Sequence, residues 1–308
     1  MKQDIKNQRL NVFICKASNY TKQGYRKTEN RGKIQKYYCK NCRKYFTNDD
    51  GFYRMRNNPQ KITCGIDLFY RGVSTRKVQE HFQTFYPHNS SHMSIYRWVV
   101  KFSKKISKFT DNLKLQVGSE VQIDEIEYKR RLHHQKGMKG VEDNYFIDSI
   151  DPKTKFMTAT NFSNQREIKD LQVVATKIKE RTGEQVEKVT TDGLRGYPKA
   201  IKKAWGYNNK LGRHNVCHKQ VITSKEDTFN YPIERLHNNV RARTKTMRGF
   251  HGSLESAKAI LKGWEIYYNF ITKHQTIKCS PYELACTDLK LEGNNKWVEL
   301  IGLSSRKN

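Results

Sequence analysis

The chain has 308 residues, with 59 Lys and Arg against 30 Asp and Glu, so its formal net charge is +29. The basic residues are spread over the whole length, which favours nucleic acid as the partner over a membrane surface or a ribosome-like assembly. No apolar run approaches the roughly 20 residues that span a bilayer, and the start "MKQDIKNQRL" is too polar for a secretory signal, so we expect a soluble, cytoplasmic protein.

The N-terminal segment contains a CxxC pair, Cys39 and Cys42, within "YYCKNCRKYF". This spacing is typical of one knuckle of a zinc ribbon, in which two hairpins each offer two thiolates to a tetrahedral ion. Upstream the sequence has only Cys15, and Val12 stands where its partner would lie. We therefore expect residues 1–50 to form a ribbon-like β module. Either its site is depleted, or zinc is held by the three cysteines and a ligand from elsewhere.

Residues 51–112 change to a helical period. Apolar residues at helical spacing end at Gly72, and Ser74 is suited to cap a second helix. A third, basic helix follows in "SSHMSIYRWVVKFSKKI". This order is the layout of a helix-turn-helix domain, which we expect to bind DNA, the alternative being a small helical connector with a basic face. The residues of the third helix available to a major groove are Ser91, His92, Ser94 and Arg97.

From residue 119 the pattern alternates like β structure. The segments "EVQIDEIEYKR", "NYFIDSIDP" and "KFMTATNFS" predict three consecutive strands. An amphipathic helix that ends at Gly183, a short strand that ends at Asp192 and a helix from near Tyr197 follow. We expect one mixed α/β domain over residues 113–290 and a tail over 291–308.

Two acidic residues occupy strand positions of this domain, Asp124 within the first strand and Asp192 at the end of the fourth. If these strands are neighbours, the two carboxylates converge. Carboxylates a few ångström apart repel one another unless a cation lies between them, and oxygen ligands suit Mg²⁺ or Mn²⁺. The pair therefore predicts a divalent metal site.

Phosphodiester chemistry with two metal ions needs a third carboxylate. Glu234 is the candidate, because it lies early in a helix opened by Pro232; Glu226 and Asp227, in an apparent loop, are the alternatives. Arg241 follows Glu234 by seven residues and falls on the same helical face, where a cation can meet a DNA backbone.

Three segments of the sequence resemble the acidic motifs of DDE-type insertion-sequence transposases. They are "QIDEIEY" with Asp124, "TTDGLRGYPKAI" with Asp192 and "PIERLHNNVRARTKTMRGF" with Glu234. The segment "LKGWEIYYNFITKHQTIKCSPYELA" is similar to the C-terminal part of such enzymes, and the ribbon and helix-turn-helix match the N-terminal half of bacterial and archaeal members. The resemblance covers roughly residues 12–288.

The resemblance implies an α/β fold, with an RNase H-like mixed sheet flanked by helices. It also implies two divalent ions, Mg²⁺ or Mn²⁺, on Asp124 and Asp192, with Glu234 completing the coordination. Arg241 and Lys245 would contact DNA. The family cleaves DNA at the terminal inverted repeats of its element, and the freed 3′-OH then attacks target DNA. A homodimer or higher oligomer on DNA, associated with the nucleoid, is implied as well.

Two other functions fit the same motifs, one non-enzymatic and one enzymatic. One is a catalytically inactive regulator descended from a transposase, and the presence of all three acids argues against it. The other is a nuclease of the same fold that cuts without strand transfer, which the sequence does not separate from a transposase.

Other polar residues near the acids have simpler interpretations. On an alternating strand Glu125 points away from Asp124, and we expect it to be solvated. The cluster "RHNVCHKQ", with His214, Cys217 and His218, is interpreted as a strand end beside the site rather than as a transition-metal site. His214 is alternatively a contact for the scissile phosphate.

Overall fold

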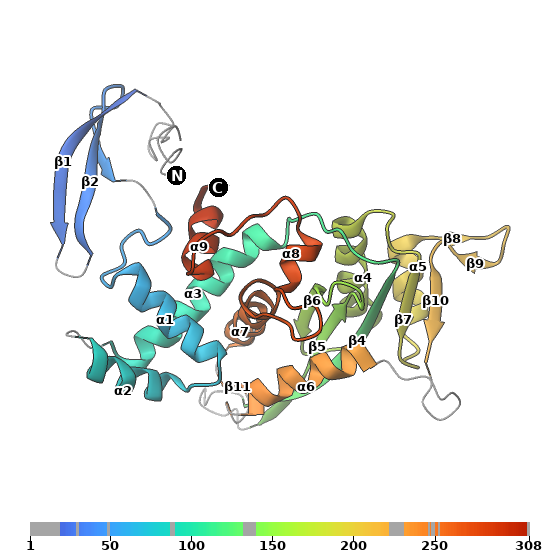
Figure 1. Cartoon of the computed structure of the whole chain (residues 1–308). Helices are drawn as coiled ribbons and strands as arrows, with labels where there is room; N and C mark the ends of the chain where they lie inside the picture. The colour runs from blue at the N-terminus through green and yellow to red at the C-terminus, as the bar shows by residue number, and fades with distance from the viewer. Residues whose placement is uncertain are drawn as a thin grey trace.

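The computed structural model describes residues 19–28, 31–47, 50–86, 90–131, 140–221, 231–245, 247, 250–251 and 253–306. Figure 1 shows a small sheet near the N-terminus, a group of helices, and a larger sheet with helices on its faces. No helix in this described part is long and apolar enough to cross a membrane.

Aromatic rings hold the small N-terminal sheet together. Its antiparallel strands are β1 (Tyr20–Thr28), β2 (Gly32–Cys39) and β3 (Tyr45–Thr47). Tyr20, Tyr37 and Phe46 come one from each strand, and their ring centroids lie 5.4 to 5.9 Å apart. Because each strand contributes a ring to the same half-buried cluster, these contacts link all three strands of the sheet.

The CxxC pair lies at one tight turn after β2. The Cys39 sulfur is buried and accepts a hydrogen bond from the backbone N–H of Cys42 at 3.5 Å. The two thiols are thus held at the same turn, as one knuckle of a ribbon requires. Cys15 and Val12 lie outside the described residues, so zinc binding by Cys15, Cys39 and Cys42 stays a prediction.

Three helices follow the small sheet, as the sequence predicts. They are α1 (Pro59–Tyr70), α2 (Thr75–Phe85) and α3 (His92–Thr110). Gly72 has a φ of +106°, a conformation that favours glycine, and therefore turns the chain after α1. The Ser74 hydroxyl oxygen accepts the N–H of Lys77 at 3.3 Å, which confirms the predicted N-cap. Ser91 caps α3 in the same way through Ser94 at 3.2 Å.

Helices from the C-terminal part pack on these three. They are α7 (Leu254–Ile266), which continues into the π-helix η1 (Tyr267–Ile271), then α8 (Pro281–Ala285) and α9 (Lys296–Arg306). Helix α9 lies against α1 and α3 (Figure 1). There the Trp297 indole N–H donates to Asp67 at 3.1 Å, and the Asn295 amide donates to the Thr63 hydroxyl at 2.9 Å.

Helix α7 crosses α1 and α3 closely at Gly263. A Cβ atom at this position would lie 2.0 Å from the Tyr70 hydroxyl oxygen and 2.1 Å from the Ser103 hydroxyl oxygen. Those two hydroxyls are 3.0 Å apart, and the Tyr70 hydroxyl also donates to the Ile260 carbonyl at 3.2 Å. Only glycine fits here, and one buried core continues from α1 and α3 through α7 to the larger sheet.

The larger sheet has RNase H-like topology. Its strands are β4 (Glu120–Arg131), β5 (Val141–Ile150), β6 (Met157–Ser163), β7 (Lys188–Thr191), β10 (Cys217–Gln220) and β11 (Phe250–His251). The order is β10-β7-β4-β5-β6, and β11 pairs with the far end of β4. Strands β4, β7 and β10 are parallel, whereas β4–β5 and β5–β6 are antiparallel. The mixed α/β fold expected from the sequence is confirmed.

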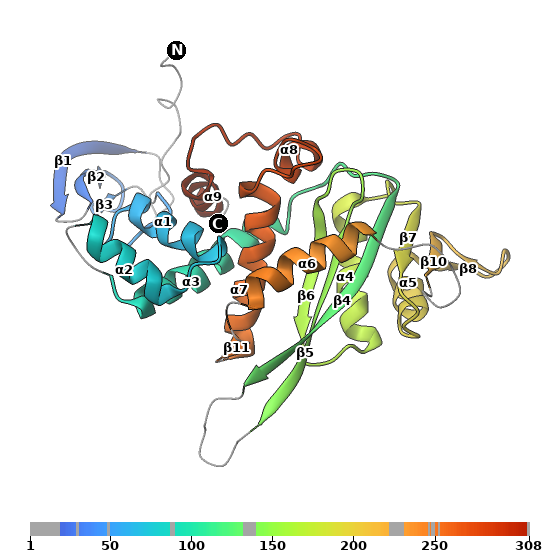
Figure 2. The same cartoon turned by 60° about the horizontal axis from the view of Figure 1, so that its bottom comes forward.

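Helices cover both faces of this sheet (Figure 2). Helices α4 (Ile168–Thr182) and α5 (Tyr197–Trp205) pack on one face, and α6 (Tyr231–Lys245) and α7 pack on the other. Ile123 and Ile147 belong to the core under α4 and α5, while Ile126 and Phe146 belong to the core under α6 and α7. Alternate residues of each strand therefore serve opposite faces.

The predicted end of helix α4 is confirmed, since Gly183 caps it and donates its N–H to the Lys179 carbonyl at 2.8 Å. A short hairpin between α5 and β10 was not expected; it consists of β8 (Tyr207–Asn208) and β9 (Arg213–His214). The predicted division into domains at residues 50, 112 and 290 stays a prediction.

Candidate active site

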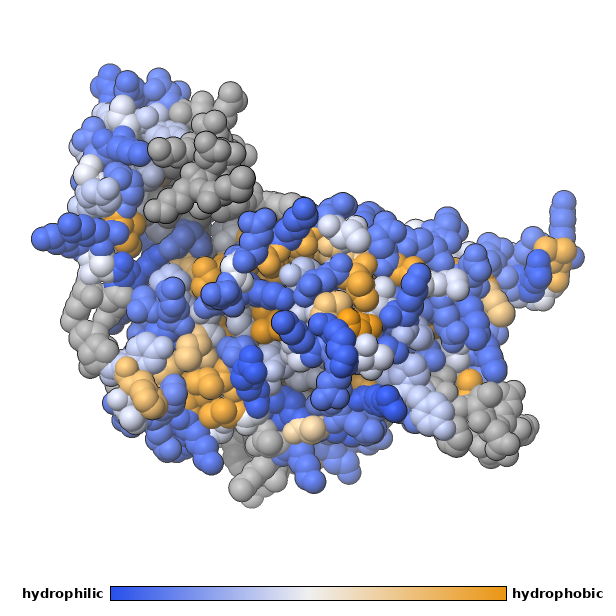
Figure 3. Space-filling model, in the orientation of Figure 1, coloured by the Kyte–Doolittle hydropathy of each residue, from blue (hydrophilic) through white to orange (hydrophobic). Residues whose placement is uncertain are grey.

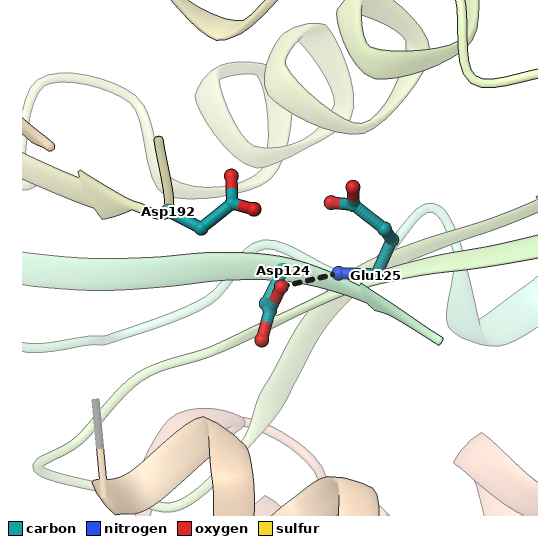
Figure 4. Close-up of side chains that lie close together, drawn as sticks. All are labelled: Asp124, Glu125 and Asp192. Carbon is teal, nitrogen blue, oxygen red and sulfur yellow. Dashed lines mark hydrogen bonds between the residues drawn. The ribbon is translucent and has the colours of Figure 1, made fainter. Parts of the chain in front are cut away.

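Asp124 and Asp192 meet where two parallel strands lie side by side. In the pairing of β4 with β7, Ile123 is opposite Thr191, and each Asp is the next residue along its chain. One carboxylate oxygen of each lies within 4.8 Å of the other, as does one oxygen of Glu125 (Figure 4). The convergence expected for Asp124 and Asp192 is therefore present.

Glu125 belongs to the acidic cluster, contrary to the expectation that it is solvated. Its side chain is 7% exposed, and its carboxylate accepts the Tyr197 hydroxyl at 2.7 Å and faces the Arg166 guanidinium at 3.4 Å. Figure 4 shows its side chain leaving β4 on the face opposite to that of Asp124, as the alternation predicts. The expectation of solvation fails because Asp192 and Tyr197 lie on that face too.

Two of the three acids are harder to ionise than free carboxyl groups. Burial raises the pKa of Asp124 to about 7, and the charges of Asp148 and Glu125 add to this against the opposing effect of His237. Burial also raises the pKa of Glu125, and the charge of Asp192 contributes. Three carboxylates with no amine or thiol among them form a donor set that suits a hard divalent cation such as Mg²⁺ or Mn²⁺.

A buried histidine joins the site to the neighbouring strand. His237 of α6 has its Nε2 atom 2.7 Å from Oδ1 of Asp148 and its Nδ1 atom 3.6 Å from Oδ2 of Asp124. Asp148 is directly opposite Asp124 in the pairing of β4 with β5. Burial opposes protonation of His237, but the two acids outweigh it and raise the pKa of the imidazole. His237 therefore ties α6 to the sheet through Asp148 and lies within ion-pair distance of Asp124.

Sequence reasoning did not identify His237 or Asp148, although both left a signal. Asp148 interrupts the apolar run "YFIDSI", and a carboxylate in a buried strand needs a partner. His237 follows Glu234 by three residues and so lies on the same face of its helix.

Glu234 lies in the first turn of α6 and is exposed. The first turn is anchored to β4, because the N–H of Ile233 donates to the Gln122 side chain at 3.3 Å. Glu234 is not among the residues whose carboxylates meet within 4.8 Å in the described part of the chain. Its role in the site, like those of Arg241 and Lys245, stays a prediction. Glu226 and Asp227 lie outside the described residues.

The histidine cluster lies beside the acids, as expected for a strand end. The His218 Nε2 atom lies 3.0 Å from the hydroxyl of Thr191, the residue before Asp192. Burial and the nearby His214 lower the pKa of His218 to about 4. Within the described residues His214, Cys217 and His218 do not come together as a metal-binding group. A contact of His214 with phosphate stays a prediction.

The residues predicted to read DNA lie at the start of α3. Ser91 and Ser94 are occupied in capping this helix, and the backbone N–H of His92 donates to the Gln79 side chain at 2.8 Å. The Arg97 side chain is exposed. The structure thus shows a helix start fixed by α2, while its role in DNA binding stays a prediction.

Comparison with known families agrees with this geometry. Residues 137–275 match the family model of a DDE domain, a stretch that includes Asp192 and Glu234 and begins after Asp124. This match supports an insertion-element transposase of the DDE type. None of the curated proteins matches the sequence. The DDE domain implies DNA as a partner and use of a divalent metal, to which the cluster of Asp124, Glu125 and Asp192 is suited.

Proposed function

We propose that the protein is a DNA transposase that cleaves DNA at the ends of its element and joins the freed 3′-OH to target DNA. The observation that carries this proposal is that Asp124, within β4, and Asp192, just after β7, meet on adjacent parallel strands, with Asp192 inside the stretch that matches a DDE domain. The net charge of +29 supports a polyanionic substrate.

Asp124 and Asp192 are the metal ligands of the proposed site, and Glu234 is the third. Bound Mg²⁺ or Mn²⁺ would neutralise charge on the reacting phosphate and polarise it toward attack. His237 orients Asp124 from the side of α6, so the carboxylate is held before any substrate arrives. Arg241 and Lys245, both exposed on α6, contact the phosphate backbone of the DNA.

Glu234 and Glu125 compete for the third position. Glu125 has hydrogen-bond partners within the protein, because Tyr197 and Arg166 both reach its carboxylate. Glu234 is exposed at the start of a helix that also carries His237. A ligand available to a metal and to DNA is better supplied by the exposed carboxylate, so we assign Glu125 to supporting the site.

The decisive experiment compares the full-length protein with Asp192→Asn on DNA that carries the sequences flanking its gene. We expect the variant to lose Mg²⁺-dependent cleavage and joining by at least about 100-fold, because one metal ligand is lost. Its binding to the same DNA should stay within about twofold.

Other outcomes of this experiment identify other functions. Unchanged activity in Asp192→Asn overturns the catalytic assignment. A wild-type protein that binds but never cleaves is a regulator, and one that cleaves without forming joined products is a nuclease. Analytical ultracentrifugation on the same DNA shows whether a homodimer or a higher oligomer assembles on paired ends.

A further inference from the structure

A cleft with a volume of about 1020 Å³ lies where three helical segments meet. It is lined by the end of α1 and the turn after it, by the outer face of α6, and by the region from α7 to residue 276. Figure 1 shows the end of α1, helix α6 and helix α7 close together here, and hydrophilic side chains cover α6 in Figure 3. The cleft is large enough for an organic ligand, since such sites typically measure roughly 300–1,000 Å³.

Helix α6 connects this cleft to the candidate active site. With 3.6 residues per turn, Glu234 and Arg241 share one face of the helix. Arg235, Asn238 and Asn239 lie on the adjoining side of the helix, and all three line the cleft. Because Glu234 and Asn238 are four residues apart, they are neighbours on the helix surface. The cleft therefore begins one helical turn from the proposed catalytic carboxylate.

The cleft is basic. Arg235, Arg243 and Lys273 line it together with Arg71, which is paired with Asp67, and none of the described residues that line it is acidic. The Arg243 guanidinium lies 4.4 Å from the centroid of the Phe69 ring and is largely buried. This charge favours an anionic occupant over a second copy of the chain, which carries a net charge of +29 itself.

Aromatic rings line the same cleft beside the cations. Trp264 and Tyr268 stack with their centroids 5.4 Å apart and their planes at 17°. Tyr267, which also lines it, opens the π-helix η1, a conformation that is rare and often marks functional sites. The Thr272 hydroxyl after η1 is buried without a hydrogen-bond partner among the described residues. A ligand with a polar edge would supply that partner.

We propose that this cleft binds an unpaired nucleotide of the DNA strand that passes the acidic site. Stacking on aromatic side chains holds bases without regard to sequence, and cations hold the phosphates. The amides of Asn238 and Asn239 match the donors and acceptors on a base edge. The proposal rests on DNA being the substrate, but not on catalysis, and binding is therefore measured without metal.

The first test uses a fluorescein-labelled oligothymidylate of about ten nucleotides, with chelator present. The double variant Arg235→Gln/Lys273→Gln changes two exposed side chains, and we expect it to bind about tenfold more weakly than the wild type. The matched control Lys199→Gln/Lys203→Gln removes the same charge from α5 and should change binding less than about twofold. If both double variants lose affinity for the oligonucleotide equally, the proposal is overturned.

The second test follows stacking directly, with one 2-aminopurine in the oligonucleotide. The wild type and Tyr267→Phe should quench its fluorescence, and Tyr267→Leu should not, because stacking needs a ring. Since Tyr267 also stacks on Tyr70, Asn239→Ala provides an exposed second variant, with affinity expected to fall about fivefold. Equal quenching by all variants, or unchanged affinity of Asn239→Ala, contradicts the proposal.

Failure of this proposal is distinguishable from failure of the proposed transposase activity. Asp192→Asn should bind the oligothymidylate as the wild type does. If the cleft variants bind it more weakly while the wild type never cleaves DNA, the cleft stands and the catalytic assignment falls. If the wild type cleaves DNA but the oligonucleotide binds equally well to all variants, the catalytic assignment stands and the cleft falls.

Discussion

The Nε2 atom of His237 lies 2.7 Å from Oδ1 of Asp148, and the two side chains are 3% and 0% exposed. The pair joins the helix that carries Glu234 to the strand next to Asp124. Residues 89 positions apart in the sequence thus fix the geometry of the site from inside the protein.

Removal of His237 should destabilise the fold. In His237→Ala, Asp148 loses its charged partner while staying buried, and breaking a buried pair typically costs about 3–5 kcal/mol. Urea unfolding at pH 7 measures the loss. The double variant Asp148→Asn/His237→Gln keeps neutral hydrogen-bonding groups and should lose less than His237→Ala. If His237→Ala lowered the free energy of unfolding by less than about 1 kcal/mol, the ion pair of His237 with Asp148 would not form in solution.

The stability of the metal-free protein should fall as the pH rises through 7. The pKa of Asp124 is about 7 in the folded state, above its value in an unfolded chain, so the folded state holds a proton that the unfolded state has lost. The stabilisation is complete at low pH and disappears as Asp124 ionises. Asp124→Asn should flatten this dependence and exceed the wild type at pH 8 by about 1–3 kcal/mol.

Urea midpoints between pH 5 and pH 8, measured with chelator, test this dependence. Asp288→Asn, at an exposed position, is the control and should follow the wild type. Addition of Mg²⁺ at pH 8 should stabilise the wild type but not Asp124→Asn, since binding to the folded state alone raises stability. Parallel profiles for Asp124→Asn and the wild type would contradict the prediction.

Replacing Glu234 by Gln should lower activity, whereas replacing Glu125 by Gln should lower stability. Glu234→Gln should lower Mg²⁺-dependent cleavage by at least about 100-fold with little effect on stability, because the side chain is exposed. Glu125→Gln should keep most activity but lose about 1–2 kcal/mol, because the Tyr197 hydroxyl loses a charged acceptor. Cleavage rates and urea unfolding of both variants distinguish the two roles. If Glu125→Gln lost the activity and Glu234→Gln kept it, Glu125 would be the metal ligand.

Arg97 should contribute to duplex binding through phosphates. In Arg97→Gln we expect affinity to fall and the slope of log K against log salt to decrease by about 1. Fluorescence anisotropy with a mixed-sequence duplex at several salt concentrations measures both quantities. Lys203→Gln on α5 is the control for loss of one charge. An unchanged slope in Arg97→Gln would place α3 away from DNA.

Gly263→Ala should destabilise the protein by about 1–3 kcal/mol or more, because the new methyl group overlaps the Tyr70 and Ser103 hydroxyls. Gly302→Ala in α9 is the matched control, since no atom lies within 4 Å of the position that its Cβ would take. That variant should be neutral or more stable by up to about 1 kcal/mol. Thermal unfolding of the two variants side by side measures the difference.

Local patterns in the sequence were sufficient to predict most of the helices and strands. The alternation around Asp124 and the amphipathic run that ends at Gly183 gave β4 and α4, because each depends on neighbours within a few residues. The meeting of Asp124 with Asp192 followed from their strand positions, one within a strand and the other at a strand end, once those strands were assumed to be adjacent.

The contacts that the sequence did not reveal join residues far apart. The pairing of His237 with Asp148 depends on how α6 crosses the sheet, and the burial of Glu125 depends on Tyr197 of α5. Periodicity describes one segment at a time and does not specify which segments face one another. The π-helix η1 continues α7 directly, and apolar residues follow one another through both, so periodicity gives no sign of it.

The hydrogen bonds from Trp297 to Asp67 and from Asn295 to Thr63 bear on how the chain folds during synthesis. N-terminal regions generally fold first as they leave the ribosome. Helix α1, by contrast, gains these partners only after more than 220 further residues have been translated. Its final packing therefore waits for the synthesis of α9, so a translation product truncated before Asn295 lacks these contacts on its N-terminal helices.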